Sequence, residues 1–273
     1  MKIKTALPGL FSRSYIMLEP SMKTHFALSL LGFHDIDAMT IWFGKNIDWT
    51  KRYVVYGYSS ILTLLRTAPK DYGLLMEQPC EAVAVEPATI SENADLENLL
   101  DLFFKRRFGF AYVERAGGAQ LGGFANLRDL VALYEKSVIK SDLRVGDVAS
   151  YPIVTMPGES NLKDVLDKMV RKNVRRVLVS GTQNSMVSDR DIVSFISSTY
   201  RQEEFRQDAS RLLDAKLQDL KSVRPASVEL ELPVDQAAKI VYQNGGCLIC
   251  GEGIVTPWDI VIKPWIQKKL LID

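Results

Sequence analysis

The chain has 273 residues, of which 47% are hydrophobic, so it can bury a substantial core in one or two domains. Its formal net charge of +1 gives no electrostatic reason to expect nucleic acid or an anionic membrane as a partner. No apolar run reaches the roughly 18 to 20 residues of a membrane-spanning helix. Three cysteines and a basic N-terminus without a signal-peptide pattern favour a reducing compartment. We therefore expect a soluble, cytoplasmic protein.

The first seventy residues predict a helix, two strands and a closing helix. Residues at helical spacing run from Met22 to Leu30 and form a weak apolar stripe. Residues 38–43 and 53–56 are expected to be strands, and 59–65 a second helix.

Three later segments repeat the same order with a clearer pattern. Residues 95–105, 161–173 and 233–244 place apolar side chains at i, i+3, i+4, i+7 and i+8, which predicts helices with one buried stripe. Each helix follows an extended segment and precedes a short apolar strand, near residues 110–113, 176–179 and 247–250. The extended segments carry a small hydroxylated residue at a constant offset: Thr89, Thr155 and Ser227.

A strand-to-helix motif closes each of these units. It reads GFANLRDL at 123–130, SMVSDRDIV at 185–193 and GIVTPWDI at 253–260. In each copy an acid follows a small polar residue by three positions, a spacing that suits a helix N-cap and also leaves both side chains able to contact a ligand. Recurrence at a fixed offset is typical of a repeat protein. The pairs are Asn126 with Asp129, Ser188 with Asp191, and Thr256 with Asp259.

The repeated units resemble the CBS (cystathionine beta-synthase) domain family. VGDVASYPIVTMPGESNLKDVLDKMVRKNVRRVLVSG with MVSDRDIVSFI, and VRPASVELELPVDQAAKIV with GCLICGEGIVTPWDIV, carry the resemblance, as does EPATISENADLENLLDLFFKRRFGFAYVER with GGFANLRDL. The resemblance implies an α+β fold of tandem CBS repeats paired into two Bateman modules, roughly 1–137 and 138–273. The repeats are expected at 1–70, 71–137, 138–200 and 201–273 (with a connector helix). In the first, Gly57 and Ser60 stand where the motif residues would be, so that copy is degenerate.

The same resemblance implies an adenosine-containing regulatory ligand such as AMP, ADP or ATP, with no cofactor required. A carboxylate can accept hydrogen bonds from both ribose hydroxyls, and a guanidinium matches phosphate geometry. Asp191 and Asp259 are then expected on the ribose, and Ser188 and Thr256 beside the ribose or phosphate. The segments holding Thr155 and Ser227 would contact the adenine edge, and a weaker site would use Asn126 and Asp129. Candidate phosphate ligands are Arg175, Arg176 and Arg190.

Structural roles compete with each of these assignments. The motif acids can be helix caps, and Arg190 can form a surface salt bridge. Cys247 and Cys250 have the CxxC spacing of zinc or redox sites, but they fall on an expected buried strand, so no metal site is predicted. Two isolated histidines supply no catalytic triad, which disfavours an enzyme.

The sequence therefore predicts a nucleotide-binding regulatory protein, for example in energy sensing, that acts in trans on an unidentified protein. The alternative is a structural or nucleic-acid-associated scaffold with vestigial clefts. Nucleic acid is disfavoured by the near-neutral charge, no membrane partner is expected, and homodimerisation is left open.

Overall fold

The computed structural model describes residues 1–12, 16–34, 36, 38–41, 53–56, 76–116, 122–181, 185–199, 208, 211–243 and 246–270. The chain forms two compact units, each assembled from separate segments. Unit 1 consists of Met1–Ser14, Pro87–Ile153 and Pro225–Asp273, and unit 2 consists of Tyr15–Glu86 and Val154–Arg224. The predicted helix at 59–65, with Gly57 and Ser60, lies outside the described residues.

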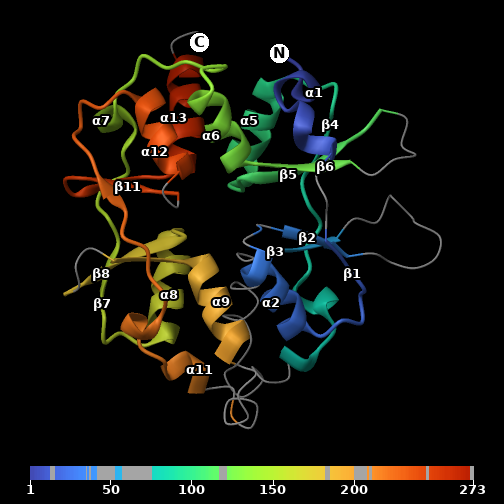
Figure 1. Ribbon diagram of the computed structural model, residues 1–273, viewed down its shortest axis with the longest axis vertical. Coiled ribbons are helices and arrows are strands. Elements are labelled where there is room, and N and C mark those ends of the chain that lie inside the picture. The colour runs from blue at the N-terminus through green and yellow to red at the C-terminus, as the bar shows by residue number, and fades with distance from the viewer. Residues whose placement is uncertain are drawn as a thin grey trace. The chain divides into compact units, whose positions relative to one another are not determined.

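Each repeat contributes a small sheet of the same topology (Figure 1). The first strand runs parallel to the second, and the second runs antiparallel to the third. This confirms the predicted order of elements, including the strands of the first repeat. The strands are β1 (Met17–Leu18), β2 (Ala38–Ile41), β3 (Tyr53–Tyr56), β4 (Thr89–Ser91), β5 (Phe110–Glu114), β6 (Gly123–Asn126), β7 (Thr155–Pro157), β8 (Arg176–Ser180), β9 (Ser185–Ser188), β10 (Ala226–Ser227), β11 (Leu248–Cys250) and β12 (Gly253–Val255).

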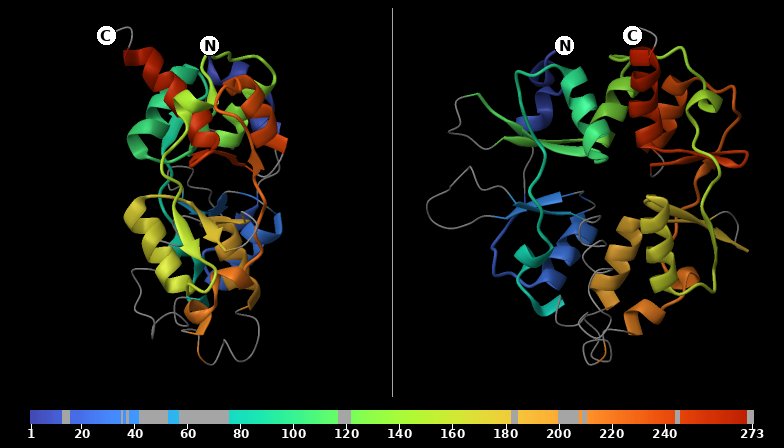
Figure 2. Two further views of the ribbon diagram at one scale, coloured as in Figure 1. Left: turned by 90° about the vertical axis from the view of Figure 1, so that its left-hand side faces the viewer. Right: turned by 180° about the vertical axis from the view of Figure 1, so that it is seen from behind.

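Unit 1 buries its core between the two sheets it contains and a group of packed helices (Figures 1 and 2). The amphipathic stripe of the second repeat is buried as predicted, with Leu99 and Phe103 fully enclosed. Reciprocal caps begin two of these helices, at Asp95 and at Asn126. The helices are α1 (Ile3–Ala6), the 3₁₀ turn η1 (Pro8–Ser12), α5 (Leu96–Arg106), α6 (Leu127–Glu135), α7 (Val145–Val148), α12 (Val234–Gln243) and α13 (Pro257–Leu270).

Unit 2 has the same construction from the first and third repeats. Its helices α2 and α9 pack closely because Gly32 has no side chain: a Cβ there would lie 3.1 Å from the Oγ of Ser194. The elements are α2 (Thr24–His34), η3 (Cys80–Val83), α8 (Leu162–Lys172), α9 (Asp189–Thr199), α11 (Arg211–Asp214) and η4 (Leu217–Asp219). No helix of the described chain is long and apolar enough to cross a membrane.

The short segments at residues 1–6 and 145–148 pack onto distant parts of the same unit. The Ile3 N–H donates to the Ala94 carbonyl at 3.0 Å, and the Val145 N–H donates to the Leu232 carbonyl at 2.8 Å. The segment limits place the crossings of the chain between the two units at residues 14–15, 86–87, 153–154 and 224–225. These limits separate the units by the contacts within each of them, and they are not the limits of the predicted modules. The division into modules at 1–137 and 138–273 stays a prediction.

Candidate functional site

The motif of the third repeat lies where β9 ends and α9 begins. The Oγ of Ser188 donates to Oδ2 of Asp191 at 2.6 Å, and the Ser188 N–H donates to the same oxygen at 2.8 Å. The pair thus caps the helix. Both residues are partly exposed, and among the described residues none contacts Oδ1 of Asp191. Oδ2 therefore serves the helix cap, and within the described residues Oδ1 is available to accept a hydrogen bond from a ligand.

Arg176 and Thr155 share a sheet face with this motif. Arg176 stands opposite Ser188 in the antiparallel pair, and Thr155 stands opposite Leu178 in the parallel pair. Directly paired residues point to the same face, and side chains two positions apart on a strand do so as well. The other face, with Val177 and Val187, is buried in the core. Within the described chain, no carboxylate forms an ion pair with the partly exposed Arg176.

Arg175 and Arg190 surround a buried acid that sequence reasoning did not single out. The Nε of Arg175 lies 2.7 Å from Oδ2 of Asp189, whose side chain is only 4% exposed. The Arg190 N–H donates to Oδ1 of Asp189 at 3.1 Å. Arg175 therefore has a structural partner, whereas Arg176 on the next position faces the motif.

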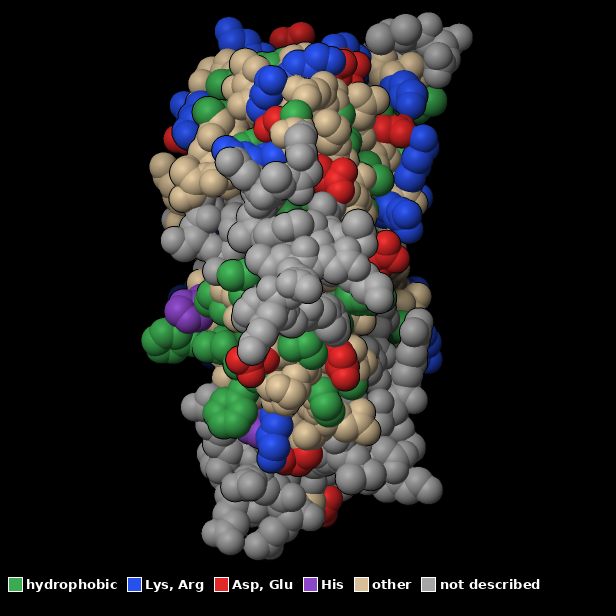
Figure 3. Space-filling model, turned by 90° about the vertical axis from the view of Figure 1, so that its right-hand side faces the viewer, with side chains coloured by type: hydrophobic (Ala, Val, Ile, Leu, Met, Phe, Trp, Pro, Cys, Tyr) green, Lys and Arg blue, Asp and Glu red, His purple; other side chains and the backbone are tan. Residues whose placement is uncertain are grey.

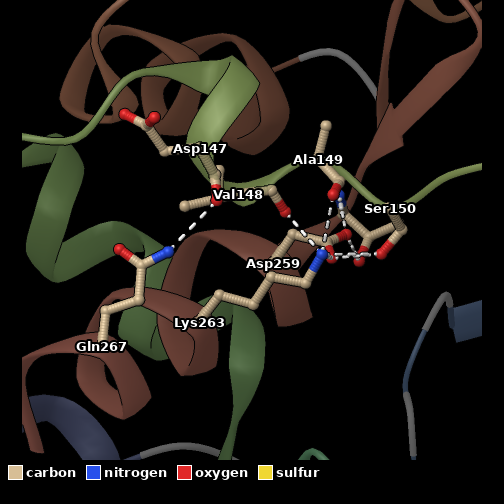
Figure 4. Close-up of polar contacts among 8 residues, drawn as sticks. Asp147, Val148, Ala149, Ser150, Asp259, Lys263 and Gln267 are labelled. Atoms are coloured by element: carbon tan, nitrogen blue, oxygen red, sulfur yellow. Dashed lines mark hydrogen bonds and ion pairs between the residues drawn. The ribbon is translucent and has the colours of Figure 1, made fainter. Parts of the chain in front are cut away.

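In the fourth repeat the motif carboxylate is enclosed, as Figure 4 shows. Oδ2 of Asp259 accepts two hydrogen bonds from Thr256, one from its N–H at 2.8 Å and one from its hydroxyl Oγ1 at 2.7 Å. Oδ1 of Asp259 accepts a hydrogen bond from the Ser150 Oγ at 2.7 Å and lies 2.9 Å from Nζ of Lys263. Asp259 is 2% exposed, so both of its oxygens are engaged inside the protein. Ser227, the other predicted residue of this repeat, is exposed on β10.

The second repeat keeps the cap and changes its neighbour. The Asn126 N–H donates to Oδ2 of Asp129 at 2.9 Å, and the Asp129 N–H donates to Oδ1 of Asn126 at 3.0 Å. Asp129 is buried. Opposite Asn126 stands Phe110, stacked on Phe124 at 5.0 Å, so an aromatic ring occupies the position that Arg176 holds in the third repeat.

Cys250 ends the buried strand β11, as predicted, whereas Cys247 directly precedes this strand. Leu248 and Cys250 face the core of unit 1, and Cys247 is also buried. Burial raises the pKa of the Cys250 thiol, against the opposing effect of a hydrogen bond with Tyr151. All three cysteines are free thiols, and the described residues contain no group of His, Cys, Asp or Glu placed to hold a metal ion.

Comparison with known proteins identifies the repeat. Residues 145–198 match the family model of the CBS domain. A crystal structure from Methanocaldococcus jannaschii, of a protein proposed to be an archaeal homologue of g-AMPK, superposes with a TM-score of 0.77 at 17% identity, covering 96% of this chain and 99% of that one. An uncharacterized conserved protein from Pyrococcus horikoshii gives a TM-score of 0.53 at 12% identity, covering 96% and 98%.

A CBS-domain protein from Agrobacterium tumefaciens is similar over 48% of this chain and 91% of its own, with a TM-score of 0.41 and 16% identity. No curated protein matches the sequence. The family match and the full-length structural similarity agree with the repeated sheet and helix order described above. Residues 145–198 thus match a CBS domain, and the chain has the α+β fold of tandem CBS repeats.

Proposed function

We propose that this chain binds an adenosine nucleotide at the third repeat and regulates a partner protein according to its occupancy. The observation that carries the proposal is the open Oδ1 of Asp191, which lies on a cap shared with Ser188 while Arg176 projects from the facing strand position. Among the described residues this carboxylate oxygen and the Arg176 cation have no hydrogen-bond or ion-pair partner, and together they suit a ligand with hydroxyl donors and a negative group.

Each part of a nucleotide has a suitable partner here. The carboxylate would accept the ribose hydroxyls, and charge-assisted hydrogen bonds of this kind are the strong ones. Arg176 would pair with a phosphate, supported by the N-terminus of the eleven-residue helix α9, where the helix dipole favours anions. Thr155 would present its strand to the adenine edge.

The regulatory part of the proposal rests on the CBS match of residues 145–198 and on the described motif residues, in which no nucleophile is paired with an activating base. The Ser188 hydroxyl donates to a carboxylate that is itself used as a helix cap, which leaves it no role as an activated nucleophile. His25 instead contacts the Met76 carbonyl at 3.1 Å. The full-length similarity to a protein proposed as a g-AMPK homologue supports a sensor that acts on another protein. Three free thiols support a cytoplasmic location.

Nucleic acid is a poorer fit than a small anion. On the face drawn in Figure 3, Lys and Arg side chains are interspersed with Asp and Glu. Electrostatic binding to nucleic acid needs cations gathered along the path of the phosphates. Arg176, which stands opposite Ser188 in the strand pair, suits one phosphate group instead.

Isothermal titration with AMP, ADP, ATP, S-adenosylmethionine and NAD tests the proposal. Asp191→Asn should weaken the binding of the recognised ligand about tenfold or more, because one charge-assisted acceptor is lost while the amide oxygen can still cap the helix. Asp164→Asn is the matched control, since Asp164 is an exposed first-turn acid at the start of α8 in the same repeat. Equal affinities in both variants, or no saturable heat with any of the five compounds, would refute the proposal.

A further inference from the structure

The fourth repeat contains a carboxylate whose hydrogen-bonding capacity is filled by the chain itself. Lys263 approaches Oδ1 of Asp259 at 2.9 Å, and Ser150 donates to the same oxygen at 2.7 Å (Figure 4). The same ammonium donates to the carbonyls of Val148 at 2.7 Å and Ala149 at 2.9 Å, and to the Ser150 Oγ at 2.9 Å. One lysine therefore joins the start of α13 to the chain at 148–150.

The backbone around this contact is anchored on the same repeat. Ser150 and Ile254 exchange two hydrogen bonds, at 2.9 and 3.0 Å, and the Ile153 N–H donates to the Glu252 carbonyl at 3.1 Å. Directly after Ile153 the chain leaves unit 1 and enters unit 2, where β7 carries the predicted binding residue Thr155. The anchor thus holds the chain just before the strand that the proposed nucleotide site uses.

The third repeat has equivalent positions without the donors. Val223 bridges Met186 there as Ser150 bridges Ile254, and Met186 and Ile254 each lie two residues before the motif hydroxyl. Phe195 follows Asp191 by four positions, as Lys263 follows Asp259. Neither valine nor phenylalanine has a side-chain donor. The described residues of the same fold therefore supply partners for both carboxylate oxygens of Asp259 but for only one oxygen of Asp191.

We propose that Ser150 and Lys263 take the place of a ligand's donors in the fourth repeat, so that Asp259 works as an internal latch and not as a nucleotide contact. The latch fixes residues 148–150 to α13. Together with the proposed function, on which this specificity argument rests, it assigns the nucleotide to the third repeat. Thr256 then serves to cap α13. The spacing of the motif alone does not distinguish an acid that binds a ligand from an acid that is held by the protein itself.

Hydrogen exchange of the ligand-free full chain tests the latch without any nucleotide. Asp259→Asn should speed exchange of the Ser150 and Ile254 amides about tenfold or more and lower the melting temperature by about 4 °C or more. The equivalent amides of Met186 and Val223 serve as internal controls and should keep their rates, as should all four amides in Asp191→Asn. Unchanged protection of Ser150 and Ile254 in Asp259→Asn would overturn the latch.

Titration with AMP provides the second arm. Asp259→Asn should keep the wild-type affinity and stoichiometry, whereas Asp191→Asn should lose affinity about tenfold or more. A loss greater than about threefold in Asp259→Asn would overturn the assignment even if exchange becomes faster. If AMP does not bind the wild type, the proposed function fails at this probe while the exchange rates still decide the latch. Should Asp259→Asn not fold, Ser150→Ala, which keeps the ion pair, is measured in its place with the same two readouts.

Discussion

The hydroxyl of Ser150 donates a 2.7 Å hydrogen bond to Oδ1 of Asp259, a residue 109 positions later in the chain. The acceptor is a carboxylate that is 2% exposed, so its charge is stabilised almost entirely by protein donors. A hydroxyl that contributes to such a buried charge is worth more than an ordinary surface hydrogen bond.

Ser150→Ala should accordingly lower the free energy of unfolding by about 1.5 to 3 kcal/mol, the range of hydrogen bonds to charged groups. Ser198→Ala is the control, because the Ser198 hydroxyl donates to a backbone carbonyl at an exposed position and its loss should cost about 0.5 kcal/mol or less. Urea unfolding followed by circular dichroism measures both. Equal midpoints for the two variants would contradict the expected weight of the buried contact.

The neighbouring arginines of the third repeat should separate into a structural and a binding residue. Arg175→Met leaves the buried Asp189 without its cation, so we expect a loss of about 1 to 3 kcal/mol in unfolding free energy, toward the lower end because Arg175 is 38% exposed. Arg176→Met removes a cation without a partner among the described residues and should change stability by only about 0.5 kcal/mol or less.

Binding should show the opposite order. Arg176→Met should weaken ATP about tenfold but leave adenosine, which lacks phosphate, unaffected. Arg175→Met should leave the ATP affinity near the wild-type value in the folded protein. Titration of both variants with both ligands checks this. The assignment is wrong if Arg175→Met loses ATP affinity while Arg176→Met retains it.

Cys80 should be a slow-reacting thiol. It is fully buried, and burial, with a smaller effect of Glu81, raises the pKa of its thiol to about 11. The thiolate is the reactive form, so a rise of about two pKa units lowers its population at pH 8 about a hundredfold before steric protection is counted. Iodoacetamide labelling with mass-spectrometric readout, native against urea-unfolded chain, measures the ratio. Labelling of native Cys80 at the unfolded rate would refute the prediction.

The sequence patterns were sufficient for the repeated elements. Apolar spacing in 161–173 predicts α8, and the short apolar runs predict β8 and β11, because these elements are specified by local periodicity. The weaker first repeat also places β2 and β3 where its pattern indicated. The limits of the compact units do not follow from such signals, since segments such as 1–6 form hydrogen bonds with residues 92–96, far along the chain.

The hydrogen-bond partners of the motif acids could be predicted only in part from the sequence. A spacing of three places Ser188 beside Asp191 and Thr256 beside Asp259, and both contacts are present. Lys263, four positions after Asp259 on one helix, carried a local signal for an ion pair that the motif comparison passed over. Ser150 carried none, because its contact depends on the fold bringing two distant segments together. The two carboxylates therefore look equivalent in the sequence, although the described residues leave an oxygen without a hydrogen-bond partner on Asp191 and not on Asp259.

Alkaline pH should expose the burial of Tyr134 on α6. Tyr134 is 5% exposed, and burial, with a smaller effect of Asp235, raises the pKa of its phenol to about 12 from an ordinary 10.0. A raised pKa means that the folded protein favours the neutral phenol, so this contribution to stability is complete below about pH 10 and is lost as the pH rises from about 10 to about 12. The loss approaches about 1.4 kcal/mol per pH unit within that interval.

Tyr134→Phe cannot ionise at this position, so its unfolding free energy should fall less steeply than that of the wild type between pH 10 and pH 11. Lysine deprotonation also affects stability in this interval, but it is common to both proteins and cancels in the difference. Tyr53→Phe, at an exposed strand position of unit 2, controls for the loss of a tyrosine as such and should follow the wild-type slope. Urea midpoints at pH 9, 10 and 11 give the three slopes. Parallel slopes for wild type and Tyr134→Phe would contradict a raised pKa of this phenol in the folded protein.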